Sequence, residues 1–159
     1  MIEPLEVGLV SYEDFLATDG HRLRRLLVAH YGVEVGTEVT SDTLAWAWEH
    51  WDELAPVANR VGYLYRVAQS NSRRYWRWRR RPAFPPEAPA SAFDPEPGLP
   101  AALTRLPEAH RVAVLLVHAH GWSYAEVAEA LDVPVSTIRN HVHRGMQKLR
   151  MILGVDDER

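Results

Sequence analysis

The chain has 159 residues, of which 47% are hydrophobic, a length and composition that suit one ordinary globular domain or two small ones. It contains no cysteine, which excludes disulfides and thiolate metal sites, and it has no apolar run of about 18 residues, so we expect a cytoplasmic protein without a membrane span. The net charge of −3 alone disfavours nucleic-acid binding, but the charge is segregated, because residues 54–86 hold eight arginines and no acid.

The first part of the chain is expected to be helical. Residues 1–10 are predicted to be a loose leader, and residues 12–30 to form one helix or two short ones, since Asp19-Gly20 interrupts their apolar spacing. Gly32 and Gly36 indicate a loop. Ser41 is then expected to cap a helix over residues 42–54, whose three tryptophans are predicted to pack in the core and at its rim rather than to bind a ligand.

A third long helix is predicted over residues 60–81, after a short loop that Pro56 opens. Its first half is amphipathic, with the inward positions Val61, Leu64, Val67 and Ala68. Its second half interleaves tyrosine and tryptophan with arginine, a combination that suits single-stranded nucleic acid, because arginine holds the backbone while rings stack on bases. A solvated basic helix end whose rings cover the core is the alternative, and the sequence leaves both interpretations open.

Residues 82–100 are predicted to be a linker. They hold seven of the eleven prolines and no lysine or arginine, so they are not expected to form a regular helix. We therefore expect an all-α fold of two small helical domains, 1–81 and 101–159, joined by this proline-rich acidic segment.

The C-terminal part contains a predicted helix-turn-helix, which follows a buried helix over residues 108–120. Ser123 and Glu126 have the spacing of a capping box, and Pro134 separates that helix from a second one over residues 135–150. Ile138, Val142, Gly145 and Leu149 form the apolar seam of the second helix.

The opposite side of this second helix is polar, cationic and free of acids, as in a helix that lies in a DNA groove. An ordinary amphipathic hairpin with a solvated face is the alternative. The candidate DNA-binding residues are Ser136, Thr137, Arg139, Asn140, His143, Arg144 and Gln147.

The sequence gives no indication of an enzyme, a metal site or a cofactor. The pairs His118/His120 and His141/His143 point about 200° apart on a helix, so neither pair can share a metal ion. We find no phosphate-binding glycine loop, nucleophile elbow or paired-carboxylate motif.

Over about residues 11–152 the chain resembles the extracytoplasmic-function (ECF) class of bacterial sigma-70 factors. The resemblance is strongest at LTRLPEAHRVAVLL (103–116) and GWSYAEVAEALDVPVSTIRNHVHRGMQKLR (121–150), which are similar to region 4, the reader of the −35 promoter element. SDTLAWAWEHW (41–51) is similar to region 2.2, and YLYRVAQSNSRRYWRWRRR (63–81) is similar to regions 2.3 and 2.4. Ala45, Ser70 and Arg74 depart from the family's pattern.

The resemblance implies a sigma factor that binds core RNA polymerase and directs promoter-specific initiation. Its partners would be promoter DNA, the clamp helices of the largest polymerase subunit and the flap of the second, and an anti-sigma factor is left open. The implied polymerase-binding residues are Asp42, Leu44, Trp48, Glu49 and Asp52. The implied −10 and melting residues are Arg60, Arg66, Asn71, Arg73, Arg74, Tyr75, Trp76, Arg77 and Trp78. Residues 54–59 would form the pocket for a flipped-out base, and the linker would reach toward the polymerase active site and RNA exit.

Two other functions remain as alternatives. One is a helix-turn-helix regulator that binds duplex DNA without joining polymerase. The other is a degenerate sigma-like interaction module, which the departures at Ala45, Ser70 and Arg74 would explain.

Overall fold

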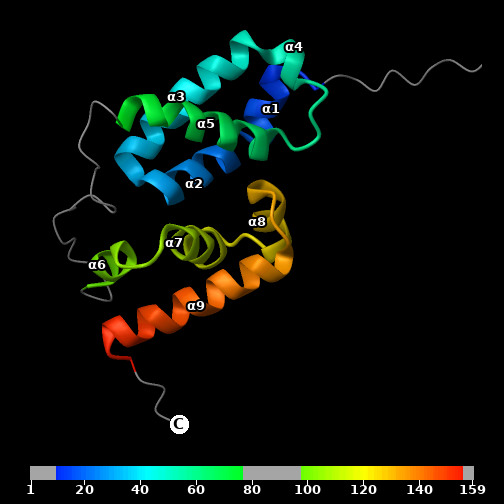
Figure 1. Cartoon of the computed structure of the whole chain (residues 1–159). Helices are drawn as coiled ribbons and strands as arrows, with labels where there is room; N and C mark the ends of the chain where they lie inside the picture. The colour runs from blue at the N-terminus through cyan, green and yellow to red at the C-terminus, as the bar shows by residue number, and fades with distance from the viewer. Residues whose placement is uncertain (1–9, 77–97, 156–159) are drawn as a thin grey trace, which may run out of the picture.

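The computed structural model describes residues 10–76 and 98–155, and these residues form helices without a strand. The all-α fold class is therefore confirmed. We refer to residues 10–76 as the N-terminal half and to residues 98–155 as the C-terminal half. The two halves lie one above the other in Figure 1.

The N-terminal half is a small helical bundle. Its helices are α1 (Tyr12–Thr18), α2 (Gly20–Tyr31), α3 (Val33–Glu49), α4 (Trp51–Leu54) and α5 (Arg60–Trp76). Two helices cover residues 12–31, in agreement with the second of the two expectations, and Asp19 separates them. The backbone N–H of Asp19 donates to the carbonyl of Phe15 at the end of α1. The carbonyl of Asp19 accepts the first hydrogen bonds of α2.

The predictions over residues 32–54 hold at the two ends, Gly32 and Leu54, but the helix boundaries between them are wrong. Helix α3 already begins at Val33, and Ser41 lies inside it, where its hydroxyl donates to the carbonyl of Thr37 at 3.2 Å instead of capping a helix. Gly36 allows α3 to approach α2 closely, since a Cβ there would lie 2.6 Å from the Cα of Val28. At the other end, His50 has φ −115° and ψ 23°, which interrupts the helix before α4.

The C-terminal half contains α6 (Leu99–Thr104), α7 (Glu108–Val114), a π-helix η1 (Leu115–Ala119), α8 (Tyr124–Leu131) and α9 (Val135–Leu153). Helix α6 begins inside the range predicted to be linker, because proline fits the first turn of a helix, where no N–H donor is needed. The predicted helix over residues 108–120 widens into the π-turn. Residues 1–9, 77–97 and 156–159, which include most of the leader and the linker, lie outside the described residues.

One hydrophobic core runs through both halves. The N-terminal half contributes Phe15, Leu23 and Leu64 to the same buried cluster as Val112 and Leu116 of the C-terminal half. Helix α2 packs on α7 and η1, and α5 packs on α8. Within the described ranges, no helix is both long and apolar enough to cross a membrane.

Candidate nucleic-acid interface

The helix-turn-helix is built as its sequence predicts. The amide of Glu126 donates to Oγ of Ser123 at 3.2 Å, and the amide of Ser123 donates to Oε2 of Glu126 at 2.8 Å, which completes the capping box. Asp132 ends α8 in the left-handed region at φ 55°, a conformation that short polar side chains tolerate. The chain then turns through Pro134 into α9.

Helix α9 is fixed by its apolar seam, which the structure confirms. Ile138, Val142, Gly145 and Leu149 are its buried residues. Gly145 faces α7 at close range, because a Cβ there would lie 2.6 Å from Cγ2 of Val114. Since the seam fills the contact with the other helices, the opposite side of α9 is turned outward.

That outward side is the predicted DNA-binding surface, and it is solvent-exposed. Thr137 is half-buried, and the other six candidates are exposed: Ser136, Arg139, Asn140, His143, Arg144 and Gln147. We call these seven residues the α9 face. The exposed Lys148 and Arg150 extend its positive charge along the helix. They were not among the predicted DNA-binding residues, although the sequence of residues 135–153 contains no acid and so indicated that the positive charge continues.

A histidine pair lies where α7 meets α9, beside this face. The rings of His110 and His141 have their centroids 5.3 Å apart. Burial lowers the pKa of His110, and the nearby His141, Arg144 and Lys148 lower it further. His110 is therefore neutral near pH 7, and it lies close to the positive charges of Arg144 and Lys148.

Two arginines of the predicted −10 set are already engaged. The guanidinium of Arg60 donates to the carbonyls of Leu54 and Ala55, so it closes the C-terminal end of α4. Nη1 of Arg66 lies 3.1 Å from Oδ2 of Asp132, in the turn before α9.

Asn71 is exposed on α5. The side chains of the other members lie outside the described part of the chain: Arg73, Arg74, Tyr75, Trp76, Arg77 and Trp78.

The loop over residues 54–59, expected to hold a flipped base, lies against α8. Asn59 accepts the amide of Gly62 on its Oδ1 at 2.8 Å and donates from Nδ2 to the carbonyl of Glu129. A shallow recess beside it is lined by Asp19, Arg22, Ala58, Asn59, Glu129 and Ala130. The loop therefore borders a recess, and residues of α8 form its far wall.

The predicted polymerase-binding residues lie along α3 and α4. Trp48 is 59% exposed, with its ring edge-on to Tyr12 at 5.0 Å. Leu44 is half-buried, and the three acids of the set, Asp42, Glu49 and Asp52, are exposed.

The other two tryptophans of this segment pack as predicted. Trp51 is half-buried and donates from Nε1 to the carbonyl of Val10 at 3.0 Å. Trp46 is half-buried and stacks on His50 at 4.2 Å. Trp48 is the member of the trio that leaves most of its surface to solvent.

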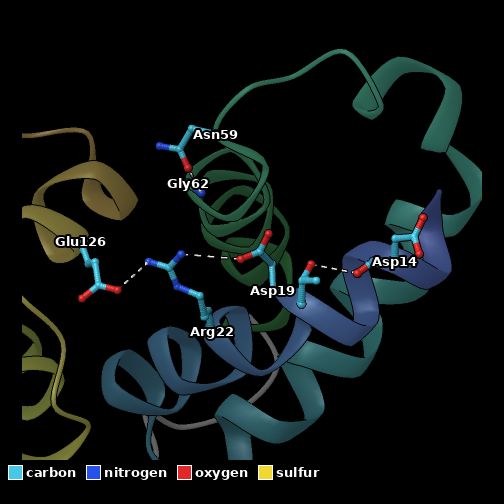
Figure 2. A network of polar contacts seen from close by, with 7 residues as sticks. Asp14, Asp19, Arg22, Asn59, Gly62 and Glu126 are labelled. Carbon is cyan, nitrogen blue, oxygen red and sulfur yellow. Dashed lines mark hydrogen bonds and ion pairs between the residues drawn. The ribbon is translucent and has the colours of Figure 1, made fainter. Parts of the chain in front are cut away.

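Polar contacts join the two halves, and the sequence did not predict them. Arg22 lies 3.8 Å from Glu126, and Nε2 of His30 lies 3.3 Å from Oε1 of Glu108. Figure 2 shows Arg22 placed between Asp19 and Glu126. These partners are far apart in the sequence, so no local pattern could have indicated them. Among the described residues, no group of three or more His, Cys, Asp or Glu is placed to hold a metal ion.

Comparison with known proteins identifies the family from the sequence. The family described as "Sigma-70, region 4" matches residues 98–149. ECF RNA polymerase sigma factor EcfG of Rhodopseudomonas palustris is 30% identical over 129 residues, which cover 75% of this chain and 71% of that protein. ECF RNA polymerase sigma factor SigE of Mycolicibacterium smegmatis is 46% identical over 52 residues, which cover 33% of this chain and 20% of that protein.

Two solved structures share the fold at 22% identity. The sigma factor RpoE, solved with the anti-sigma factor NepR from Bartonella quintana, has a TM-score of 0.63 over 91% of this chain and 98% of that one. CnrH, solved with the cytosolic domain of CnrY, has a TM-score of 0.59 over 92% of this chain and 89% of that one. Given the extent of the match to EcfG, together with the region 4 match over the helix-turn-helix, this chain belongs to the ECF RNA polymerase sigma factors.

Proposed function

We propose that this chain binds core RNA polymerase and directs it to promoters, with the C-terminal half reading the −35 element and the N-terminal half holding the −10 strand. The observation that carries this proposal is the α9 face, which is exposed, free of acids and fixed in place by the buried seam. The proposal divides the chain into residues 1–81, a linker over 82–100 and residues 101–159.

At the −35 element, α9 enters the major groove, as the second helix of a helix-turn-helix does. Arg139 and Arg144 contact guanine or phosphate, because the guanidinium fork matches either acceptor pair. Asn140 and Gln147 have the amide groups that pair with adenine. Ser136 lies in the first turn of α9, where it contacts the DNA backbone.

At the −10 element, helix α5 and the arginine-rich stretch after it bind the separated strand. Unstacking a base costs a few kcal/mol, and stacking on aromatic side chains returns about 1–3 kcal/mol per base. Binding of this kind captures the open form of the promoter without a catalytic residue. In this proposal the chain is a binding factor in the cytoplasm, and polymerase performs the synthesis.

Polymerase binding is assigned to the exposed surface of α3 and α4. Trp48 offers an aromatic anchor, and the exposed Asp42, Glu49 and Asp52 add negative charge to the same two helices. Exposed tryptophan within a polar rim is a frequent arrangement at binding hot spots. The clamp helices of the largest subunit are the proposed partner of this surface, and the flap of the second subunit is the partner of the C-terminal half. An anti-sigma factor is a further proposed partner, since RpoE and CnrH, which share this fold, were solved with NepR and CnrY.

A gel shift on promoter fragments, with and without core polymerase, tests this function against the alternative of an independent regulator. A sigma factor gives a specific shift only when core enzyme is present. A duplex-binding regulator gives the same shift alone, and that result would reject the proposal.

A further inference from the structure

The ring of Tyr124 lies beside the α9 face, although Tyr124 is not one of the seven residues that form it. Tyr124 is the first residue of α8, and Arg139 lies in the second turn of α9. The Cζ atom of Arg139 lies over the Tyr124 ring, 6.0 Å from the ring centroid. A guanidinium over an aromatic ring at this distance is attracted by the negative charge of the ring face. The ring of α8 therefore contacts an arginine to which the proposed function gives a DNA contact.

Tyr124 is held in place by the fold. The capping box fixes the backbone at the start of α8, and the Tyr124 ring is half-buried and packs against the hydrophobic core. Val127 lies on the same side of α8, because it is three residues further along, and it is fully buried. Ile138, next to Arg139, is fully buried as well, and α8 packs on the beginning of α9 (Figure 1). The position of the ring is thus set by the packing of two helices and does not depend on DNA.

Arg139, by contrast, is exposed and has a long side chain. Within the described ranges, no acid forms an ion pair with it. Arginine is among the side chains that lose the most rotamer freedom when they are fixed, so a guanidinium that is already held binds a base at a lower entropic cost. Arginine can lie with its flat face on a ring while the N–H groups at its edge stay free, and these groups form the fork that binds guanine.

The second arginine of the α9 face lacks such support. In the part of the chain that the structure describes, no tyrosine, tryptophan or phenylalanine ring lies under the guanidinium of Arg144. Both arginines are exposed, and both lie on the same helix. They therefore differ in one respect that can be tested, which is the ring of Tyr124.

We propose that Tyr124 is a positioning residue for recognition of the −35 element: its ring holds Arg139 in the orientation from which the guanidinium reads one base pair. This inference rests on the proposed function, which places α9 in the major groove. The first helix of a helix-turn-helix crosses the DNA backbone while the second enters the groove, so the ring supports Arg139 from the side and leaves the base edges open to it. Selection at that base pair then depends on α8 as well as on α9.

Two substitutions at Tyr124 separate the ring from the rest of the side chain. Tyr124→Leu removes the ring and keeps an apolar side chain for packing against the core. Tyr124→Phe keeps the ring and removes only the hydroxyl. Tyr124→Leu is also combined with Arg139→Ala and, as the matched control, with Arg144→Ala. A melting curve of each variant reports its folding.

Transcription in vitro, with the full chain and core polymerase on promoters randomised across the −35 element, measures selection at every base pair. The base pair read by Arg139 is the one at which Arg139→Ala loses selection. With subsaturating holoenzyme, we expect Tyr124→Leu to lower initiation from the preferred promoter about two- to fivefold, the effect of one exposed cation–π contact. Selection should be relaxed at that base pair alone, and Tyr124→Phe should restore it. Tyr124→Leu should lower initiation no further when added to Arg139→Ala, and by the same factor as before when added to Arg144→Ala.

Four results would overturn the proposal. A uniform loss of selection at every −35 base pair in Tyr124→Leu would show that the ring only supports the fold. Equal losses in Tyr124→Leu and Tyr124→Phe would assign the effect to the hydroxyl. A further loss on adding Tyr124→Leu to Arg139→Ala would show that the ring acts independently of Arg139. Selection by Tyr124→Leu identical to that of the parent would reject the inference and leave the proposed function standing, whereas a parent chain that adds no start site would reject both.

Discussion

The Nδ1 atom of His30 lies 2.6 Å from the hydroxyl oxygen of Tyr65, and His30 is 8% exposed. The other ring nitrogen, Nε2, faces Glu108 of the C-terminal half at 3.3 Å. Burial lowers the pKa of His30, the charge of Glu108 opposes that shift, and Arg111 reinforces it. The neutral ring therefore accepts from Tyr65 and donates to Glu108, and it connects α2, α5 and α7.

Stability should decrease as the pH falls below about 6.5, the ordinary pKa of histidine. Burial lowers the pKa of His30, His110 and His120 in the folded protein. Below the ordinary value the unfolded chain binds protons that the folded chain does not, so the free energy of unfolding falls with decreasing pH. Urea midpoints measured between pH 7.5 and 5.5 check this. His30→Gln should reduce the change of the urea midpoint with pH. His21→Gln is the control, because His21 is exposed and lies in the same helix, α2. A midpoint independent of pH over this range would contradict the neutral burial of His30.

Tyr65→Phe should destabilise the protein by about 1–3 kcal/mol, because it leaves a buried ring nitrogen of His30 without its donor. Burial raises the pKa of Tyr65, so its phenol keeps the proton that it donates. Tyr63→Phe is the matched control on the same helix, since Tyr63 is 38% exposed. The control should change the free energy of unfolding by no more than about 0.5 kcal/mol. Equal effects of the two variants in urea titrations would refute the role given to the Tyr65 hydroxyl.

Gly36→Ala should destabilise the N-terminal half although alanine favours a helix by about 1 kcal/mol over glycine. The new Cβ would lie 2.6 Å from the Cα of Val28, and backbone atoms cannot move aside cheaply. Overpacking of this kind typically costs about 1–3 kcal/mol. At Gly20 the Cβ would be 3.6 Å from the side chain of Leu16, an ordinary contact, so Gly20→Ala should be neutral or stabilising. Thermal unfolding of both variants decides the matter, and a stabilised Gly36→Ala would show that α2 and α3 do not pack so closely.

Trp48→Ala should weaken binding to core polymerase and leave the melting temperature nearly unchanged. Truncation of an aromatic anchor at a binding hot spot costs about 2 kcal/mol or more, while its exposed ring contributes little to folding. Trp51→Ala should lower the melting temperature and leave polymerase binding nearly unchanged, because Trp51 is half-buried against Phe15 and Tyr12. The measurement is copurification with core enzyme beside a melting curve. Retention of Trp48→Ala on core at the level of the parent chain would place the polymerase surface elsewhere.

The helix-turn-helix was predictable because its signals are local. Ser123 and Glu126 define the start of α8, Pro134 separates the helices, and the four-residue apolar seam of α9 shows which side faces outward. Each of these features acts within a few residues along the chain, so the sequence alone is enough to predict the helix-turn-helix.

The boundaries of α3 were not predictable in this way. Gly36 is usually a loop signal, but here it allows two helix backbones to touch, and Ser41 bonds back along the helix instead of capping it. Both outcomes depend on α2, which packs against α3 only after folding.

The engagement of Arg60 and Arg66 was hidden from the sequence for the same reason. Arg66 pairs with Asp132, a residue that the chain reaches only after the linker, and Arg60 bonds to the carbonyls of Leu54 and Ala55 across the turn between α4 and α5. Composition identified a basic segment correctly, but the partners of individual arginines are set by long-range packing.

Transcription in vitro with core polymerase on a genomic promoter library, with start sites mapped, tests the central claim most directly. We expect the chain to add specific start sites to those made by core alone. Arg139→Ala and Arg144→Ala should each weaken the binding free energy for promoter DNA by about 1–3 kcal/mol and relax selection within the −35 element. Met151→Ala, at a 78% exposed position of α9 outside the α9 face, should leave selection intact. Unchanged promoter selection in both arginine variants, or no new start sites with the parent chain, would contradict the account.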